Sequence, residues 1–268
     1  MSVSRIETAF RDAVSEGRLA LVPFLTAGFP DPRSTVETAL ALAREGAQAL
    51  EIGIPFSDPI ADGPVIQEAS QRALAQGVGM EGALAVVREI RAAAPIPIVL
   101  MTYANPVLRF GSSRFAAAAA AAGADGGILT DVPPEELPET WAALRAADLA
   151  TILLVTPLTR PERLARILEG GSGFLYVVSR AGVTGRGGAA AGLEKFLAGV
   201  RARTTLPLAV GFGIEGPEQV RALRGRADGA VIGTALLRAI GAAGPGGAAR
   251  AGARFFEPLV SAAAGTGG

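Results

Sequence analysis

Short runs of aliphatic residues alternate with longer amphipathic segments along most of the chain. Eight of these runs have the length and composition of buried strands, and Gly, Pro or Thr ends or closely follows each of them. They cover residues 19–25, 50–54, 98–101, 127–130, 151–155, 174–178, 208–211 and 229–232. Helical periodicity separates them, and it also precedes the first run, where Ile6, Phe10 and Val14 share one face of residues 4–15.

Strands that alternate with helices predict an α/β fold with a parallel sheet. Eight such units in 268 residues favour a (β/α)8 TIM barrel, with a doubly wound open sheet as the alternative. We expect an extra N-terminal helix and two further helical segments, over residues 65–75 and 81–93, before the third strand. No linker or change of composition divides the chain, so we expect one barrel domain over residues 1–268.

The charge balance argues against two classes of partner. The chain has 25 basic and 25 acidic residues, so its formal net charge is zero. Neither nucleic acid nor an anionic membrane surface is therefore an expected partner. The N-terminus lacks the pattern of a secretory signal, and no apolar run is long enough to cross a bilayer. We expect a cytoplasmic protein.

Missing residue types narrow the chemistry further. The sequence has no Cys and no His, which excludes thiol nucleophiles, imidazole bases and the usual zinc sites, and we expect no metal centre. Lys195 is the only lysine and lies in a predicted helix, away from any strand end. A Schiff base is therefore not expected, and acid–base chemistry is left to carboxylates, tyrosine, the backbone and arginine.

The second strand and the loop after it, residues 49–64, combine buried positions with carboxylates. Leu50, Ile52 and Ile54 face one side of the strand, so Glu51 faces the other, toward the interior of a barrel at its C-terminal mouth. A carboxylate among aliphatic residues is costly to bury unless it has a partner or a function. Glu51 is either a core residue in an ion pair or a catalytic group, with Asp62 on the adjoining loop as a second carboxylate.

Glycines follow the last three predicted strands and suggest a phosphate site. Gly211 to Ile214 follow the seventh strand, and Gly233-Thr234 follow the eighth and begin a helix. Gly182 to Gly185 follow the sixth strand. Backbone N–H groups and a helix N-terminus at this end of a barrel bind phosphate without a basic side chain. Each glycine taken singly is equally consistent with an ordinary turn.

The segment after the sixth strand, Ser179 to Gly192, is long for a βα connection and rich in glycine. It is either a loop that closes over a ligand or a surface insertion. Tyr176 shares a strand face with Phe174 and Val178, so it either fills the barrel or lines a pocket. Arg180 either reaches a phosphate or is solvated.

Several of these stretches resemble the tryptophan synthase α subunit family. The sequence Glu51-Ile52-Gly53-Ile54-Pro55-Phe56-Ser57-Asp58-Pro59-Ile60-Ala61-Asp62-Gly63-Pro64 is similar to the family signature. Further similar blocks occur in the same order, at Pro23–Gly28, Tyr103–Pro106, Asp131–Pro133, Ser179–Gly185 and Gly211–Ile214. Two departures are Thr234 where Ser is usual and Phe29 where Asp is frequent. The Gly/Ala-rich stretch Gly187 to Gly192 also differs in composition.

The resemblance implies a lyase that cleaves indole-3-glycerol phosphate to indole and glyceraldehyde 3-phosphate in tryptophan biosynthesis. It implies Glu51 as the acid–base catalyst and Asp62 as the group that binds the indole N–H. The remaining residues implied to bind substrate are Phe24, Leu100 and Tyr176 around the indole ring, Gly185, Gly213, Gly233 and Thr234 at the phosphate, and Thr184 closing over Asp62.

The resemblance also implies a partner. A β subunit would carry pyridoxal phosphate, this chain would hold no cofactor, and the two would form an α2β2 tetramer. We expect that partner to pack on Pro55, Phe56, Pro59 and Ile60. Two alternatives are another phosphosugar-binding barrel enzyme and a catalytically silent subunit that activates a β partner.

Overall fold

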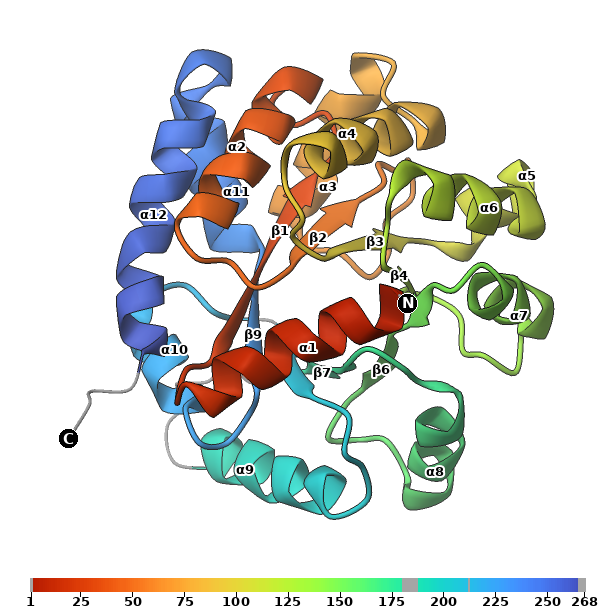
Figure 1. Cartoon of the computed structure of the whole chain (residues 1–268), viewed down its shortest axis with the longest axis vertical. Coiled ribbons are helices and arrows are strands. Elements are labelled where there is room, and N and C mark those ends of the chain that lie inside the picture. The colour runs from red at the N-terminus through yellow and green to blue at the C-terminus, as the bar shows by residue number, and fades with distance from the viewer. Residues whose placement is uncertain (1, 180–187, 212, 265–268) are drawn as a thin grey trace.

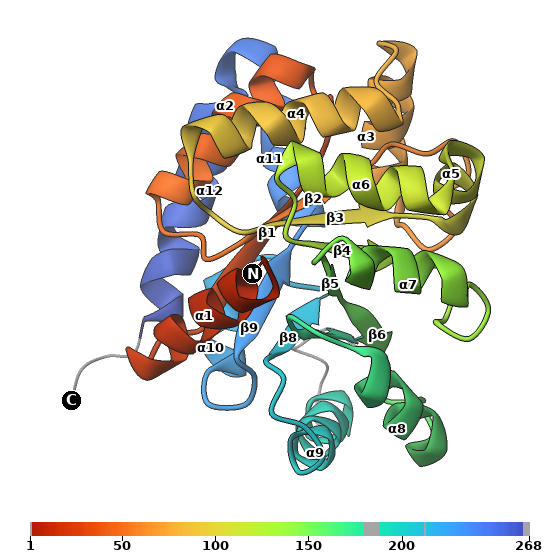
Figure 2. The same cartoon turned by 45° about the vertical axis from the view of Figure 1, so that its right-hand side comes forward.

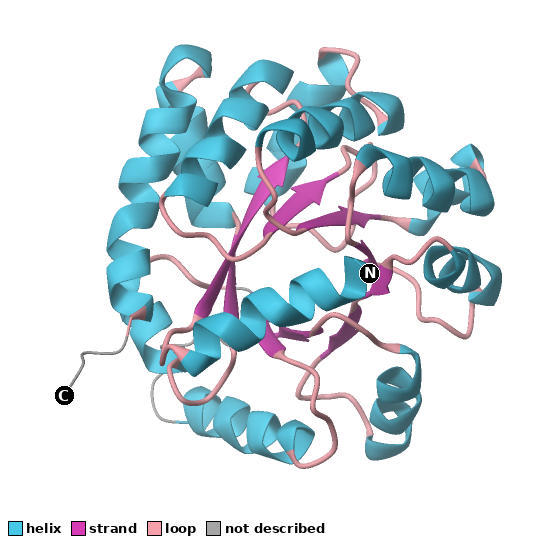
Figure 3. Ribbon diagram, in the orientation of Figure 1, coloured by secondary structure: helices cyan, strands magenta, loops and turns pink. Residues whose placement is uncertain are grey.

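The sheet of this protein, seen in a computed structural model, is a ring of nine parallel strands surrounded by helices (Figure 1; Figure 3). The structure describes residues 2–179, 188–211 and 213–264. The strands are β1 (Ala20–Thr26), β2 (Leu50–Gly53), β3 (Ile98–Thr102), β4 (Gly126–Leu129), β5 (Ala150–Thr151), β6 (Leu153–Val155), β7 (Leu175–Val178), β8 (Leu208–Gly211) and β9 (Gly229–Ile232). Their order in space is β5-β4-β3-β2-β1-β9-β8-β7-β6.

Strands β5 and β6 are the two ends of that order and are consecutive in the chain, with only Ile152 between them. The N–H of Ile152 donates to the carbonyl of Gly127 at 3.1 Å, and its side chain is fully buried. One short segment therefore pairs with β4 on one side and β7 on the other, which closes the sheet. The (β/α)8 barrel is confirmed, and the predicted fifth strand, residues 151–155, is divided in two.

Helices surround the barrel and cover its outer face (Figure 2). They are α1 (Ser2–Ser15), α2 (Pro32–Arg44), α3 (Pro64–Ala75), α4 (Met80–Ala93), α5 (Ala104–Phe110), α6 (Ser112–Ala122), α7 (Pro138–Ala146), α8 (Pro161–Gly170), α9 (Gly188–Arg201), α10 (Pro217–Leu223), α11 (Thr234–Ala243), a 3-10 turn η1 (Pro245–Gly247) and α12 (Ala248–Ala263). The predicted extra helices correspond to α1, α3 and α4. No helix in the described ranges has both the length and the apolar character needed to span a bilayer.

Two helices begin earlier than the sequence pattern predicts. Asn105 and Pro106 lie in the first turn of α5 rather than in a loop, because a proline is tolerated where the N–H has no helical partner. Helix α9 begins at Gly188, although the sequence favoured a loop to Gly192.

The parallel register decides which side chains enter the barrel. Phe24 of β1 pairs with Glu51, and Glu51 pairs with Val99 of β3. Paired residues of neighbouring strands lie on the same face of a sheet, and successive residues alternate between faces. Glu51 therefore shares the inner face with Phe24. Leu100 pairs with Ile52 and belongs to the outer face, which is covered by helices.

Helix α1 closes the opposite end of the barrel, where it lies across the strand N-termini (Figure 1). Ile6 and Phe10 are fully buried, and the ring of Phe10 stacks on that of Phe174 with a centroid separation of 5.2 Å. A Cβ at Gly229 would approach the Phe10 ring to 2.5 Å, so this glycine makes room for the ring. The extra N-terminal helix thus completes the core at the end away from the strand C-termini.

Asp125 ties α1 and α4 to the sheet at this same end. It is 1% exposed and accepts hydrogen bonds from the Ile98 N–H at 2.8 Å and from Nη2 of Arg91 at 2.5 Å. Nε of Arg5, on α1, lies 3.4 Å from the other carboxylate oxygen. Burial raises the pKa of Asp125, while the Ile98 N–H and the two guanidinium groups oppose that shift. The three donors thus offset part of the effect of burial on this carboxyl group.

Replacing Asp125 by Asn should lower the free energy of unfolding by about 2–4 kcal/mol, because it leaves the half-buried Arg91 without its counter-ion. Urea denaturation followed by circular dichroism measures the change. The exposed pair Arg33–Glu37 provides the matched control, and Glu37→Gln should leave stability unchanged. Equal effects of the two substitutions would contradict a structural role for Asp125.

Candidate active site

A cavity of about 480 Å³ opens where the strands end, at the C-terminal mouth of the barrel. We call it the inner cavity. Aliphatic residues form the largest part of its wall, and three carboxylates, a tyrosine, three threonines and a helix N-terminus interrupt that wall. The lining residues are Phe24, Glu51, Ile60, Ala61, Asp62, Ile66, Met101, Ile128, Thr130, Leu154, Thr156, Tyr176, Val178, Gly213, Ile214, Glu215, Val231, Gly233 and Thr234.

Glu51 reaches this cavity from the middle of β2 and is 1% exposed. Neither of its carboxylate oxygens has a hydrogen-bond partner within the described residues. Burial in this wall, assisted by the negative charge of Asp62, raises the pKa of Glu51 to about 8. The carboxyl group is therefore largely protonated at neutral pH, which suits a general acid. An ion pair, the structural alternative that the sequence left open, is absent from the described part of the chain.

Asp62 lies on the loop between β2 and α3, which two backbone hydrogen bonds tighten. The Ile60 N–H donates to the Asp58 carbonyl at 2.9 Å, and the Asp62 N–H donates to the Pro59 carbonyl at 3.0 Å. Oδ2 of Asp62 accepts a hydrogen bond from the Tyr103 hydroxyl at 2.9 Å. Burial raises the pKa of Asp62 to about 6, and the hydrogen bond from Tyr103 limits the rise. Asp62 is thus ionised at neutral pH, when Glu51 is not.

Two aromatic rings contribute to the apolar wall, and each depends on a glycine of a neighbouring strand. A Cβ at Gly53 would lie 2.6 Å from the Phe24 ring, and one at Gly211 would collide with the phenol of Tyr176. Glycine at these positions therefore lets both rings lie inside the barrel. Tyr176 is 8% exposed, and burial together with the charges of Glu51 and Asp62 raises its pKa. This tyrosine lines the cavity as well as filling the barrel.

The glycines after β8 and β9 reach the same cavity at its other side. Gly213 has a φ of +78°, a conformation that glycine adopts readily, and both it and Gly233 line the wall. Gly233 is the N-cap of α11, and no side chain at this position accepts a hydrogen bond from the first N–H groups of the helix. The first N–H groups of a helix have no partner within the helix, and the helix dipole makes this end positive. Thr234 adds a hydroxyl, so an anion fits this end of the cavity.

The inner cavity brings together seven of the residues selected from the sequence: Phe24, Glu51, Asp62, Tyr176, Gly213, Gly233 and Thr234. Leu100 does not line it among the described residues, because the register places Leu100 on the outer face. Its neighbour Met101, which pairs with Gly53, takes that place. Thr184 and Gly185 lie outside the described residues, as does Arg180.

Tyr103 was not selected from the sequence, although it follows β3 directly. Its side chain is 2% exposed and contacts the loop that carries Asp62. Burial, Asp62 and its hydrogen bond raise the pKa of Tyr103, so the phenol remains a hydrogen-bond donor. Its position at a strand end, the same kind of position that singled out Glu51 and the glycines, was the signal available in the sequence.

Lys195 is exposed on α9 and does not line the inner cavity of the described chain. Within the same residues, no group of three or more His, Cys, Asp or Glu side chains is arranged to hold a metal ion. Among the described residues, the titratable groups that line the cavity are Glu51, Asp62, Glu215 and Tyr176, beside the N-terminus of α11.

Comparisons with known proteins agree on one family. The family model for the tryptophan synthase alpha chain matches residues 10–255. The tryptophan synthase alpha chain of Burkholderia cenocepacia is 44% identical over 99% of this chain and 98% of its own length. That of Rhizorhabdus wittichii is 47% identical, with coverage of 97% and 96%.

Solved structures agree with the sequence matches. Tryptophan synthase subunit alpha from Legionella pneumophila superposes with a TM-score of 0.88 at 36% identity, and the match covers 96% of this chain and 97% of that one. A chain of Mycobacterium tuberculosis tryptophan synthase gives 0.88 at 34% identity, with coverage of 97% and 98%. The chain therefore belongs to the tryptophan synthase alpha chain family.

Proposed function

We propose that this protein cleaves indole-3-glycerol phosphate to indole and glyceraldehyde 3-phosphate, as the α subunit of a tryptophan synthase. The observation that carries the proposal is that the inner cavity holds Glu51, which has no hydrogen-bond partner among the described residues, together with Asp62, which accepts from Tyr103. These surroundings raise the pKa of Glu51 to about 8 and that of Asp62 to about 6. Two carboxyl groups whose surroundings separate their pKa values divide the roles of acid and base between them.

The reaction breaks a carbon–carbon bond and needs a place for the bonding electrons. An amine that forms a Schiff base supplies one, but Lys195 lies on the outer surface of α9. Protonation of the indole ring at C3 makes the ring itself the electron acceptor. In this mechanism Glu51 donates that proton, and Asp62 accepts a hydrogen bond from the indole N–H and stabilises the positive charge of the ring.

The second step returns the proton to Glu51. As a carboxylate, Glu51 removes the proton from the hydroxyl on the carbon attached to C3, and the C–O bond becomes a carbonyl. The carbon–carbon bond breaks and its electron pair neutralises the ring, which leaves indole and glyceraldehyde 3-phosphate. The cycle requires Asp62 ionised and Glu51 protonated at the start, a combination found between about pH 6 and pH 8.

The cavity also fits the rest of the substrate. Phe24, Met101 and Tyr176 provide apolar surface for a planar ring, and the N-terminus of α11 with Gly213 provides N–H groups for a phosphate. Thr184 and Gly185 remain assigned to closing over Asp62 and to the phosphate on the family resemblance alone.

We also propose that the protein works with a β subunit in a cytoplasmic α2β2 complex, in which pyridoxal phosphate belongs to the β subunit and this chain holds no cofactor. The site of contact we infer differs from the sequence prediction. Pro55 and Pro59 are buried and Phe56 is half-buried, whereas Ile60 is 83% exposed. Leu158, after β6, is 87% exposed and Leu108, on α5, is 51% exposed. Three of the four exposed large hydrophobic side chains of the described residues thus belong to connections at the strand C-termini, where a partner would bury them.

Glu51→Gln should abolish indole release, since loss of a positioned acid–base group reduces the rate by about 10²–10⁴.

The same substitution, Glu51→Gln, should stabilise the fold. A raised pKa means that the folded state binds the proton more tightly, so the wild type loses stability as the pH rises from the ordinary value of 4.5 to about 8. At pH 7 the gain of the Gln variant is at most about 3 kcal/mol.

Melting curves of both proteins between pH 4 and pH 9, with indole release assayed on the same samples, test this. The difference in stability should be small near pH 4 and grow with pH. Glu37→Gln, at an exposed position, is the control and should show no such trend. An inactive variant that is less stable at every pH would make Glu51 a structural residue, and a fully active variant would remove it from the mechanism.

Gly233→Val should raise the KM for the phosphorylated substrate about 10- to 100-fold with little change in kcat, because the side chain blocks approach to charge-assisted N–H donors. The φ of −116° at Gly233 is accessible to other residues, and a Cβ there meets Phe24 at an ordinary 3.6 Å. Gly216→Ala, in the preceding βα connection, is the control. Glycerol 3-phosphate should raise the melting temperature of the wild type and of the control but not of Gly233→Val; equal protection of all three would place the phosphate elsewhere.

The proposed contact with the β subunit predicts that Leu158→Ser and Leu108→Ser each weaken binding about 10-fold, since each removes apolar surface that the complex buries. Val14→Ser, at an exposed position on α1 at the other end of the barrel, should bind normally. Titration of β into each variant, read as stimulated indole release, gives the affinities. Normal binding by both leucine variants would exclude this surface as the contact. If the wild type released no indole even in the presence of β, the chain would be a catalytically silent subunit.

A further inference from the structure

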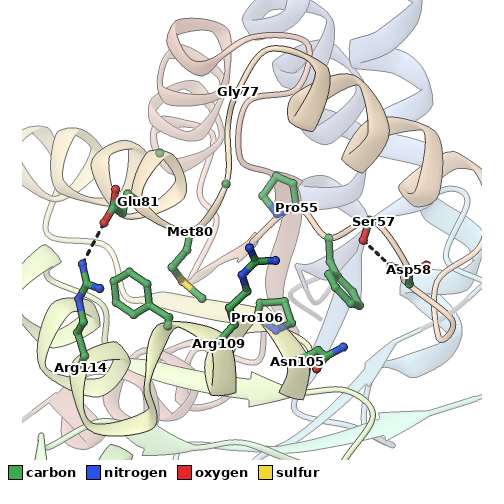
Figure 4. A pocket seen from close by; sticks show the side chains of 14 residues that line it. Pro55, Ser57, Asp58, Gly77, Met80, Glu81, Asn105, Pro106, Arg109 and Arg114 are labelled. Atoms are coloured by element: carbon green, nitrogen blue, oxygen red, sulfur yellow. Dashed lines mark hydrogen bonds and ion pairs between the residues drawn. The ribbon is translucent and has the colours of Figure 1, made fainter.

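A second cavity lies on the outer side of the loop that carries Asp62 (Figure 4). This outer cavity has a volume of about 730 Å³. Figure 4 shows that one wall is formed by Pro55 and Ser57 of the loop, and another by Asn105 and Arg109 of α5. The residues that complete it are Phe56, Asp58, Gly77, Gly79, Met80, Glu81, Gly82, Pro106, Phe110 and Arg114. Asp62 and the outer cavity are therefore separated by one short loop and the start of one helix.

Tyr103 occupies that partition, as the residue immediately before α5. Its hydroxyl donates to Oδ2 of Asp62 at 2.9 Å and accepts a hydrogen bond from the Ala61 N–H at 3.1 Å. On the other side, its ring lies 5.3 Å from the ring of Phe56, at an interplanar angle of 36°. One buried side chain thus touches a carboxylate of the inner cavity and an aromatic residue of the outer one.

We propose that Tyr103 is the positioning residue of Asp62 and that it relays the packing of Phe56 in the outer cavity to that carboxylate. This inference rests on the proposed function, in which Asp62 binds the indole N–H.

The hydrogen-bond pattern explains how Tyr103 would act. In the described part of the chain no other group donates a hydrogen bond to the Asp62 carboxylate. The phenol occupies Oδ2 and favours the ionised form, which leaves Oδ1 available as an acceptor for the substrate. A carboxylate on a loop has no rigid element to orient it, so the bond from a residue at a strand end supplies the orientation.

Tyr103 is also connected to the outer cavity by direct contacts. Phe56 packs against the Tyr103 ring, and Asn105, Pro106 and Arg109 belong to the helix that Tyr103 precedes. Asp131 fixes the start of that helix, since its Oδ1 accepts from the Ala104 N–H at 2.8 Å. A change of packing at Phe56 or at the start of α5 therefore displaces the phenol, and a displaced phenol lengthens its bond to Asp62.

Tyr103→Phe removes only the hydroxyl and is the first test. We expect kcat for indole release to fall about 10- to 100-fold, as for loss of a hydrogen bond to a charged group, with a smaller change in KM. The acidic limb of the pH profile, which reports ionisation of Asp62, should move to higher pH, because the ionised form loses its donor. The basic limb should not move. The other titratable groups that line the inner cavity are Glu51, Tyr176 and Glu215, and all are unchanged in this variant.

A merely structural role for Tyr103 would give a different result. It would lower the melting temperature and the active fraction but leave both limbs of the profile in place, and that outcome would overturn the inference. If the wild type itself released no indole, with or without β, the proposed function would fail instead, so the two failures are distinguishable.

The relay is tested with Phe56→Leu, alone and combined with Tyr103→Phe. Phe56→Leu should shift the acidic limb in the same direction as Tyr103→Phe, and it should add no further shift in the double variant. Phe110→Leu is the matched control: Phe110 lines the same cavity but packs under the guanidinium of Arg114, 4.1 Å from the ring centre, and should leave the limb unchanged. Additive shifts in the double variant, or an equal shift in the control, would contradict a relay through the phenol.

Discussion

The alternation of side chains along a parallel strand places the carboxyl group of Glu51 inside the barrel, where no donor in the described residues reaches it. A charged group in such a place is unfavourable, so the group holds its proton to an unusually high pH. Two glycines of the barrel leave space for aromatic rings on the inner face. Gly53 follows Glu51 on the same strand and leaves space for Phe24, and Gly211 leaves space for Tyr176.

Asp62 shows how a small difference in surroundings separates two similar groups. It comes from a loop and is less deeply buried than Glu51, and it has a phenol as a hydrogen-bond donor. Its pKa therefore stays near 6, which leaves an ionised and a protonated carboxyl group in one cavity. The difference arises chiefly from the depth of burial, with the Tyr103 hydroxyl lowering the pKa of Asp62 and the charge of Asp62 raising that of Glu51.

The two ends of the barrel have separate tasks. At the N-terminal end, α1 seals the core with Phe10, and the buried carboxylate of Asp125 accepts a hydrogen bond from the Ile98 N–H and forms ion pairs with two arginines. At the C-terminal end, the carboxyl group of Glu51 faces a cavity and has no hydrogen-bond partner among the described residues, and no side chain caps the N-terminus of α11. Stability and chemistry thus depend on different residues, as is usual in barrel enzymes.

The sequence by itself determined the barrel and the position of every principal strand, and it selected Glu51 and Asp62 as the candidates for the reactive pair. Local alternation, glycine and proline punctuation and one long motif sufficed, because these features depend on residues close together in the chain. Four features were decided only by the tertiary structure: the division of the fifth strand at Ile152, the place of Met101 rather than Leu100 in the cavity wall, the burial of Pro55 and Pro59, and the hydrogen bond from Tyr103 to Asp62. The register of β3 with β2 decides which side chains of β3 face the inside of the barrel. A shift of one residue would turn the opposite set of side chains inward. Tyr103 and Asp62 lie 41 residues apart in the sequence, so no local pattern encodes their hydrogen bond. The burial of the prolines likewise depends on the path of the loop that carries them.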